Sequence, residues 1–129
     1  MPEEYRIDEK QKIVWSRCWG VLSDADLLAQ QARLRTEPKF QPGFCQLINT
    51  SEVTETTMTG EAVKRVAQNS LFAPESKRAF VVVKNVVYGM GRMFELYQGL
   101  KGGSSVRVFR DRAVALAWLG VNDEPAGDK

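Results

Sequence analysis

The chain reads Arg78-Ala-Phe-Val-Val-Val-Lys84 and then Asn85-Val-Val-Tyr-Gly-Met-Gly-Arg-Met-Phe-Glu-Leu-Tyr97. The first run is unbroken, apolar and mainly β-branched, which is typical of a strand covered on both faces, and the second has the spacing of a helix. The same order returns in Val106-Arg-Val-Phe109 and Arg110-Asp-Arg-Ala-Val-Ala-Leu-Ala-Trp-Leu119. Two successive strand–helix units predict an α/β fold with a mostly parallel sheet and helices packed on it.

Periodicity and turn residues predict the other elements. They are a hairpin of strands 5–7 and 13–19 ended by Gly20, a helix from the N-cap Ser23 to about Thr36, a strand at 44–48, a polar loop at 49–58 and a helix from Thr59. Asn85 and Asp111 are expected to cap the two helices that follow. The fold class is therefore a mixed, mostly parallel sheet of about five strands, with an N-terminal hairpin and four helices packed on it.

The length of 129 residues predicts one domain, at 1–121, with 122–129 as a disordered tail. The apolar fraction of 43% and the charged fraction of 26% are those of an ordinary globular protein. A net charge of +2 is too small to indicate a nucleic-acid partner. The basic residues of the second half are expected to form a solvated surface, and a basic face is the alternative.

Targeting and redox signals are few. No apolar stretch approaches the roughly 20 residues that cross a bilayer, and Met-Pro-Glu-Glu does not resemble a signal peptide, so a cytoplasmic location is expected. Cys18 and Cys45 are expected to be buried free thiols. The chain has no histidine, which excludes His-based triads and His-ligated metal sites. We expect no metal and no cofactor.

The element order is hairpin, helix, strand, polar loop, helix, strand, helix, strand, helix. With Tyr88-Gly-Met-Gly-Arg-Met-Phe94 and the closing Val108-Phe-Arg-Asp-Arg112 and Ala117-Trp-Leu-Gly120, the chain resembles the STAS-like domains of the SpoIIAA-like superfamily over about residues 3–120. More narrowly, it is similar to stand-alone bacterial members that are grouped with CRAL-TRIO-like lipid-binding domains. The resemblance implies a regulatory or binding role rather than an enzymatic one.

Signalling members of that superfamily, similar to anti-sigma-factor antagonists, carry an Asp-Ser-Ser/Thr-Gly motif whose hydroxyl residue is phosphorylated at a helix N-terminus. Thr57-Met58-Thr59-Gly60 occupies the corresponding position, and only Thr59 and Gly60 match the motif. The resemblance makes Thr59 and Thr57 candidate phosphoacceptors, and a phosphate at a helix start would be stabilised by the free amides there. The alternative is a simple helix cap contributing about 1 kcal/mol.

Methionines and aromatic residues gather near the second and third predicted helices and could line an apolar ligand cavity, because methionine adapts to irregular spaces. The candidates are Met58, Phe72, Tyr88, Met90, Met93, Phe94 and Tyr97. An ordinary core is the alternative, since helical spacing by itself predicts burial.

Lys84, Asn85 and Arg92 could converge near the carboxyl end of a central strand, where open α/β sheets bind ligands. There they would hold an anionic head group, and a solvated surface is the alternative for Lys84.

Two functions remain open from the sequence. One is a non-enzymatic STAS-like module that binds a protein partner, switched at residues 57–60. The other is a small carrier or sensor of an apolar, lipid-like ligand. Without histidine, catalysis would fall to carboxylates such as Glu61 or Glu95, and neither has a partner at a persuasive spacing.

Overall fold

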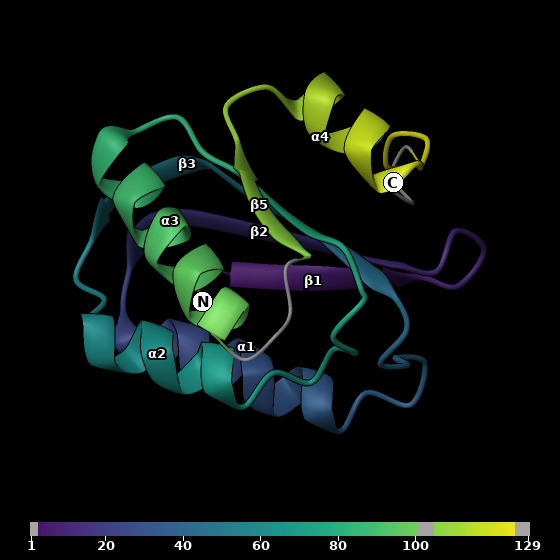
Figure 1. Cartoon of the computed structure of the whole chain (residues 1–129), viewed down its shortest axis with the longest axis horizontal. Helices are drawn as coiled ribbons and strands as arrows, with labels where there is room; N and C mark the ends of the chain where they lie inside the picture. Colours follow the sequence, from purple (N-terminus) through teal and green to yellow (C-terminus); the bar gives the residue numbers. More distant parts are fainter. Residues whose placement is uncertain (1–2, 101–104, 126–129) are drawn as a thin grey trace.

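The computed structural model describes residues 3–100 and 105–125, apart from the side chains of residues 68, 86 and 97–100. The chain forms five strands and four helices in this part (Figure 1). In chain order they are β1 (Glu3–Asp8), β2 (Ile13–Leu22), α1 (Asp24–Arg35), β3 (Cys45–Thr56), α2 (Gly60–Gln68), β4 (Arg78–Val81), α3 (Asn85–Leu100), β5 (Val106–Phe109) and α4 (Arg112–Leu119). The predicted element order and α/β class are confirmed.

The strands lie side by side in their order along the chain, β1 to β5. β1 and β2 form the predicted antiparallel hairpin, and every later neighbour is parallel to the strand before it. Each parallel step is made through a helix, because a crossover must return the chain to the same end of the sheet. The result is the mixed, mostly parallel sheet that the sequence predicts.

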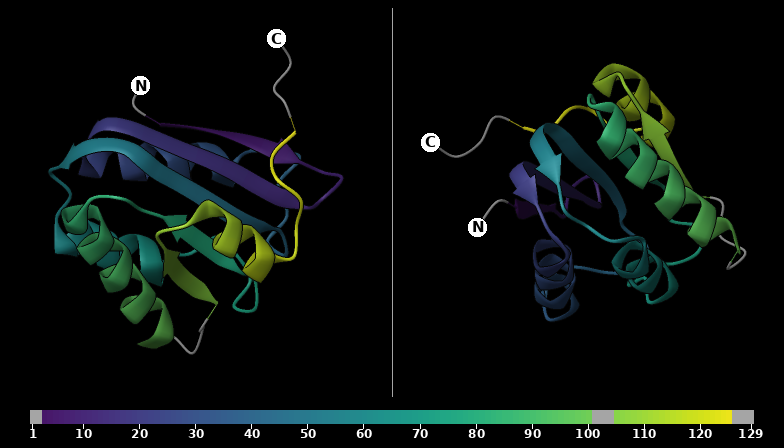
Figure 2. Two further views of the ribbon diagram at one scale, coloured as in Figure 1. Left: turned by 90° about the horizontal axis from the view of Figure 1, so that it is seen from above. Right: turned by 90° about the vertical axis from the view of Figure 1, so that its left-hand side faces the viewer.

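The sheet separates two layers of helices (Figure 2). α1 packs against α2 and α2 against α3, so these three cover one face, which we call the three-helix face. α4 packs on β4 and β5 from the other face, which we call the α4 face. Consecutive strand residues point to opposite faces. On the α4 face they build one apolar cluster, formed by Ile13, Trp15, Leu47, Ala79, Val81, Ala115 and Leu119.

β2 and β3 are longer than predicted. Residues 49–56 continue β3 instead of forming a loop, and they pair with β2 from Arg17 to Leu22, past Gly20. Gly20 adopts a positive φ of 67° beside a register shift, so it bulges the strand and does not end it. Both predictions were wrong for one reason: each extension supplies the other with a hydrogen-bonding partner, and Val53 is buried there, 1% exposed.

Helix capping follows the sequence with one exception. Ser23 and Asp26 form a capping box at α1, and Thr59 and Asp111 cap α2 and α4. Asn85 was expected to cap α3 but is its first residue, and its side-chain oxygen accepts a hydrogen bond from Arg110 Nη2 at 2.8 Å. The side-chain oxygen of Asn85 is therefore bound by Arg110 and not by the free amides at the start of α3.

Residues 122–125, which the sequence predicts as part of a tail, lie against the hairpin. Arg6 Nη2 donates to the carbonyl of Pro125 at 2.8 Å and pairs with Glu124 at 2.9 Å. Asn122 exchanges two hydrogen bonds with Gln11. These contacts tie the segment to β1 and to the turn after it; residues 126–129 lie outside the described part.

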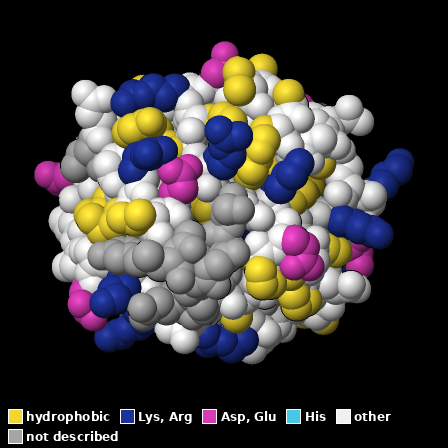
Figure 3. Space-filling model, in the orientation of Figure 1, with side chains coloured by type: hydrophobic (Ala, Val, Ile, Leu, Met, Phe, Trp, Pro, Cys, Tyr) yellow, Lys and Arg dark blue, Asp and Glu magenta, His cyan; other side chains and the backbone are white. Residues whose placement is uncertain are grey.

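Charges on the surface are mixed. Figure 3 shows lysine and arginine spread over one face, with acidic side chains among them and no single basic patch. In the described part of the chain, no helix has both the length and the apolar character needed to span a bilayer.

Candidate ligand-binding cavity

A cavity of about 90 Å³ lies between the three-helix face of the sheet and helices α1, α2 and α3. Its lining is mainly apolar and includes Leu22, Leu27, Val63, Val66 and Met90. Close-packed interiors contain few voids larger than one water molecule. A second hollow of about 220 Å³ is lined mainly by polar and charged residues such as Glu4, Arg17 and Arg112, so the apolar lining and not the size makes the space beneath the three helices the first place to look for an apolar ligand.

Two polar side chains of the sheet, Gln46 and Arg78, line this cavity and are held by further polar partners. Gln46 on β3 and Arg78 on β4 are register partners, and Arg78 Nε donates to Gln46 Oε1 at 3.1 Å. Gln46 Nε2 in turn donates to Ser16 Oγ at 2.8 Å, and Arg78 Nη1 donates to Ser70 Oγ at 3.1 Å. Each residue holds the next in one orientation.

Arg78 is buried, with 8% of its surface exposed. Its guanidinium carbon lies 4.4 Å from the ring centroid of Phe72 and 5.0 Å from that of Phe94. Burial lowers the pKa of Arg78 to about 9, because a low-dielectric environment disfavours the charged form. The group still carries its charge at neutral pH. Two aromatic faces and two neutral acceptors stabilise a cation that has no carboxylate partner among the described residues.

Glu3, on the edge strand β1, also lines the cavity. Its side chain is 1% exposed, and both of its oxygens accept from Arg33, at 2.6 and 2.5 Å. Gln30 Nε2 donates to the same carboxylate at 2.9 Å. Burial opposes ionisation, but the hydrogen bonds from Arg33 and Gln30 outweigh it and lower the pKa of Glu3. The negative charge of Glu3 is already paired with Arg33, so it does not compensate the positive charge of Arg78.

The one cysteine that lines the cavity is unreactive. Cys18 lines the cavity, is 6% exposed and is a free cysteine, as is the half-buried Cys45. Burial, with the nearby charges of Glu3 and Asp26, raises the pKa of Cys18 to about 12. Because the thiolate is the reactive form, this side chain is a poor nucleophile.

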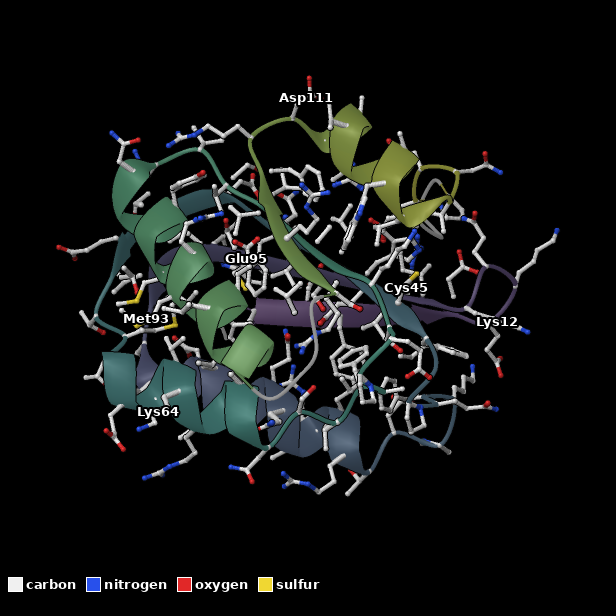
Figure 4. All side chains as sticks on the ribbon, in the orientation of Figure 1. Lys12, Cys45, Lys64, Met93, Glu95 and Asp111 are labelled. Carbon is white, nitrogen blue, oxygen red and sulfur yellow. The ribbon has the colours of Figure 1, made fainter. Side chains whose placement is uncertain are left out.

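The Met and aromatic residues predicted to line a cavity divide into two groups. Met58, Phe72 and Met90 do line it. Tyr88, Met93 and Phe94 pack in the surrounding core instead. Figure 4 shows Met93 between α3 and α2, where its sulfur would lie 3.4 Å from a Cβ added to Gly60. The side chain of Tyr97 lies outside the described residues.

The structure does not bring the residues of the predicted anion site close to one another. Lys84, Asn85 and Arg92 are all exposed. Asn85 accepts from Arg110, and Arg92 forms an ion pair with Glu95 one turn along α3, at 2.6 Å. None of the three lines the cavity. The buried cation of this fold is Arg78, at the start of the same strand rather than at its end.

Thr57 and Thr59 are both exposed beside the start of α2. Thr59 Oγ1 accepts from the amide of Ala62 at 3.1 Å and donates to Asp24 Oδ2 at 2.9 Å. The amide of Thr59 also donates to Asp24, at 2.7 Å. The hydroxyl thus caps α2 and ties it to the first turn of α1.

The sequence patterns did not identify three polar residues at or beside the cavity, Arg78, Gln46 and Ser16. Arg78 was grouped with surface cations, although it directly precedes a buried strand run. The available signal was alternation: Gln46 precedes the buried Leu47, and a polar residue inside a doubly covered strand must be satisfied in the interior. Among the described residues, no cluster of His, Cys, Asp or Glu could hold a metal ion.

Comparison with known proteins supports the fold. No family model matches the chain, and no curated protein matches it. A solved structure, an uncharacterized protein of the DUF3478 family with a SpoIIAA-like fold from Shewanella loihica PV-4, matches with a TM-score of 0.62 and 15% identity. The match covers 91% of this chain and 93% of that one. The chain has a SpoIIAA-like fold, which confirms the resemblance seen in the sequence at the level of fold.

Proposed function

We propose that this protein is a non-enzymatic SpoIIAA-like binding module that holds a small, largely apolar molecule beneath α1, α2 and α3. The observation that carries the proposal is the cavity of about 90 Å³ at this junction, lined by aliphatic and methionine side chains. Ligand sites are typically concave and apolar with a few fixed polar groups. Gln46 and Arg78, which are held in place by Ser16 and Ser70, supply such groups here.

The size of the cavity sets the size of the ligand. Each water-sized sphere needs roughly 10–15 Å³ of such volume, so the space corresponds to about six to nine spheres. An apolar cavity that binds one benzene ring measures about 150 Å³, so a six-carbon chain or a single aromatic ring is the largest ligand expected with only small movements of the helices. A long lipid chain needs α1, α2 or α3 to shift outward.

Binding is favoured over a phosphorylation switch by the surroundings of Thr59. A phosphate on its hydroxyl would lie beside the carboxylate of Asp24, which accepts from that hydroxyl at 2.9 Å. Two negative groups at this distance repel each other, and the tie between α1 and α2 would be lost. Thr57 lies in the same exposed segment, after the last residue of β3. We therefore place the function in the cavity.

Binding is also favoured over catalysis. Glu61 is exposed on the first turn of α2, and Glu95 is engaged by Arg92. Neither carboxylate lines the cavity, and its thiol is held protonated by burial. The groups that do line it can hold and orient a molecule.

The test uses two six-carbon probes, hexanoate and 1-hexanol, titrated into the intact protein and followed by two-dimensional amide NMR. We expect saturable one-to-one binding of at least one probe, with shifts concentrated on α1, α2, α3 and the residues beneath them. Val66→Phe, which fills the cavity, should abolish these shifts. Val114→Phe is the matched control, because Val114 is 54% exposed on α4, and it should bind like the wild type.

Failure of both probes to saturate, or equal binding by Val66→Phe, would refute the proposal. Thermal unfolding of both variants confirms that each is folded before it is titrated.

A further inference from the structure

Arg78 differs from the other arginines in the described part of the chain, because it alone is buried. Arg6, Arg17, Arg33, Arg92 and Arg112 each pair with a carboxylate, and their side chains are 31–60% exposed. Arg78 is 8% exposed and has no such partner among the described residues. Taking a cation out of water is unfavourable by several kcal/mol unless an opposite charge compensates it. Arg35, Arg65, Arg107 and Arg110 also form no ion pair among the described residues, but all four are exposed, so Arg78 alone combines burial with an uncompensated charge.

The guanidinium is also held in a fixed position with unused donors. Its Nε and Nη1 reach Gln46 and Ser70, while Nη2 has no acceptor in the described part of the chain. Gln46 cannot turn away, because its amide nitrogen is engaged by Ser16. Arginine presents its donors in a rigid planar fork that matches a carboxylate. The side chain lines the cavity, so these remaining donors can serve a molecule inside it.

We propose that Arg78 is the anion receptor of the cavity, and that the ligand is a small amphiphilic carboxylate whose charged group binds the guanidinium while its apolar part lies among Leu27, Val63, Val66 and Met90. This inference rests on the proposed function and specifies the ligand class for the same site. It moves the anion-binding role from the exposed Lys84 and Arg92 to a residue inside the fold.

Charge balance selects a carboxylate over a phosphate monoester. Arg78 contributes one positive charge, and the other acidic or basic side chains that line the cavity, among the described residues, are Glu3 and Asp26. Glu3 is already paired with Arg33, and Asp26 belongs to the capping box with Ser23. A ligand with one negative charge balances the one positive charge of Arg78. A phosphate monoester, at about −1.5 to −2, would leave uncompensated charge in an apolar space that contains two acids.

The experiment compares hexanoate with 1-hexanol by isothermal titration calorimetry, using wild type, Arg78→Met and Arg78→Lys. The two probes have the same chain and differ in the head group. We expect wild type to bind hexanoate at least about tenfold more tightly than 1-hexanol, as expected for a charge-assisted bidentate contact. Arg78→Met should lose this preference and keep its affinity for 1-hexanol. Arg78→Lys should retain part of the preference.

NMR of the wild type gives a second readout that needs no variant. With ¹⁵N-labelled arginine, the Nε–H signal of Arg78 should shift on saturation with hexanoate and much less with 1-hexanol. A purely structural arginine, stacked between Phe72 and Phe94, would respond equally to both probes.

Equal affinity of wild type for hexanoate and 1-hexanol would overturn the inference and leave the proposed function intact. An unchanged preference in folded Arg78→Met would also overturn it. If neither probe binds, the proposed function and the inference fail together. Hexanoate preference with the Arg78 shift, lost in Arg78→Met, supports both.

Discussion

Beneath α4, the sheet contributes Leu47, Ala79 and Val81 to a close apolar core, whereas on the opposite face the preceding positions are Gln46, Arg78 and the half-buried Phe80. The same two strands supply both sets, one residue apart. One helix covers the first set, and three helices cover the second and leave a cavity against it. The α4 face is thus closed by one apolar cluster, whereas the three-helix face combines three apolar clusters with a cavity that borders polar groups.

The largest expected effect comes from truncating matched leucines on the two faces. Leu47→Ala removes a side chain that is 1% exposed in the α4 core, and we expect about 4–5 kcal/mol less free energy of unfolding. Leu22→Ala removes a side chain that is 5% exposed but already borders the cavity. It has fewer neighbours to lose, so we expect about 2–3 kcal/mol. Urea unfolding measures both, and equal losses would remove the contrast between the faces.

Arg78→Met should change stability in the opposite direction. The substitution removes a buried charge that no described carboxylate compensates, although Gln46 Oε1 loses its donor. We expect the free energy of unfolding to rise by about 1–3 kcal/mol in the absence of ligand. Arg78→Lys keeps the charge and should not be stabilised. A loss as large as that of Leu47→Ala would mean that the guanidinium supports the fold and is not held ready for a ligand.

Glu3→Gln probes the edge of the three-helix face by pH. The pKa of Glu3 is lowered in the folded state, so its ionised form stabilises the fold above the unfolded pKa, and this contribution is lost as the pH falls through the folded pKa. We expect wild type to lose stability below about pH 4.5 more steeply than the variant. At pH 7 the variant should be about 1–2 kcal/mol less stable, a value discounted because Arg33 is 41% exposed. Thermal unfolding between pH 3 and 7 gives both curves.

Thr59→Ala gives the smallest expected effect. It removes the cap of α2 and one of the two hydrogen bonds to Asp24, which should lower the free energy of unfolding by about 1 kcal/mol. Thr59→Ser keeps the hydroxyl and should behave like wild type. Hexanoate binding should be unchanged in both variants, since Thr59 does not line the cavity. Weakened binding in Thr59→Ala alone would show that the α1–α2 tie controls the cavity.

The fold could be predicted because its signals are local. The β-branched and aromatic residues at 79–83 and 106–109 predicted strands, of which β4 ends at Val81 and β5 covers 106–109. Ser23, Thr59 and Asp111 cap their helices through residues two or three positions away. Where a prediction was wrong, the deciding partner was distant. The sequence of residues 49–56 is typical of a polar loop. They form a strand because β2 lies beside them and supplies their hydrogen-bonding partners.

The candidate site could be predicted only in part for the same reason. Met58, Phe72 and Met90 were identified by residue type, and they do line the cavity. Lys84, Asn85 and Arg92 also have suitable side chains, but their positions place them on the surface. Nothing near Arg78 in the chain shows that Gln46, 32 positions away, accepts its Nε–H.

The sequence alone determined the order of strands and helices, the parallel crossovers and three of the helix caps, because these depend on periodicity and on contacts within a few residues. The tertiary structure decided which face of each strand is closed by one helix and which by three. That choice places Arg78 inside the molecule, since the burial of a charge depends on what packs over it and not on its neighbours in the chain.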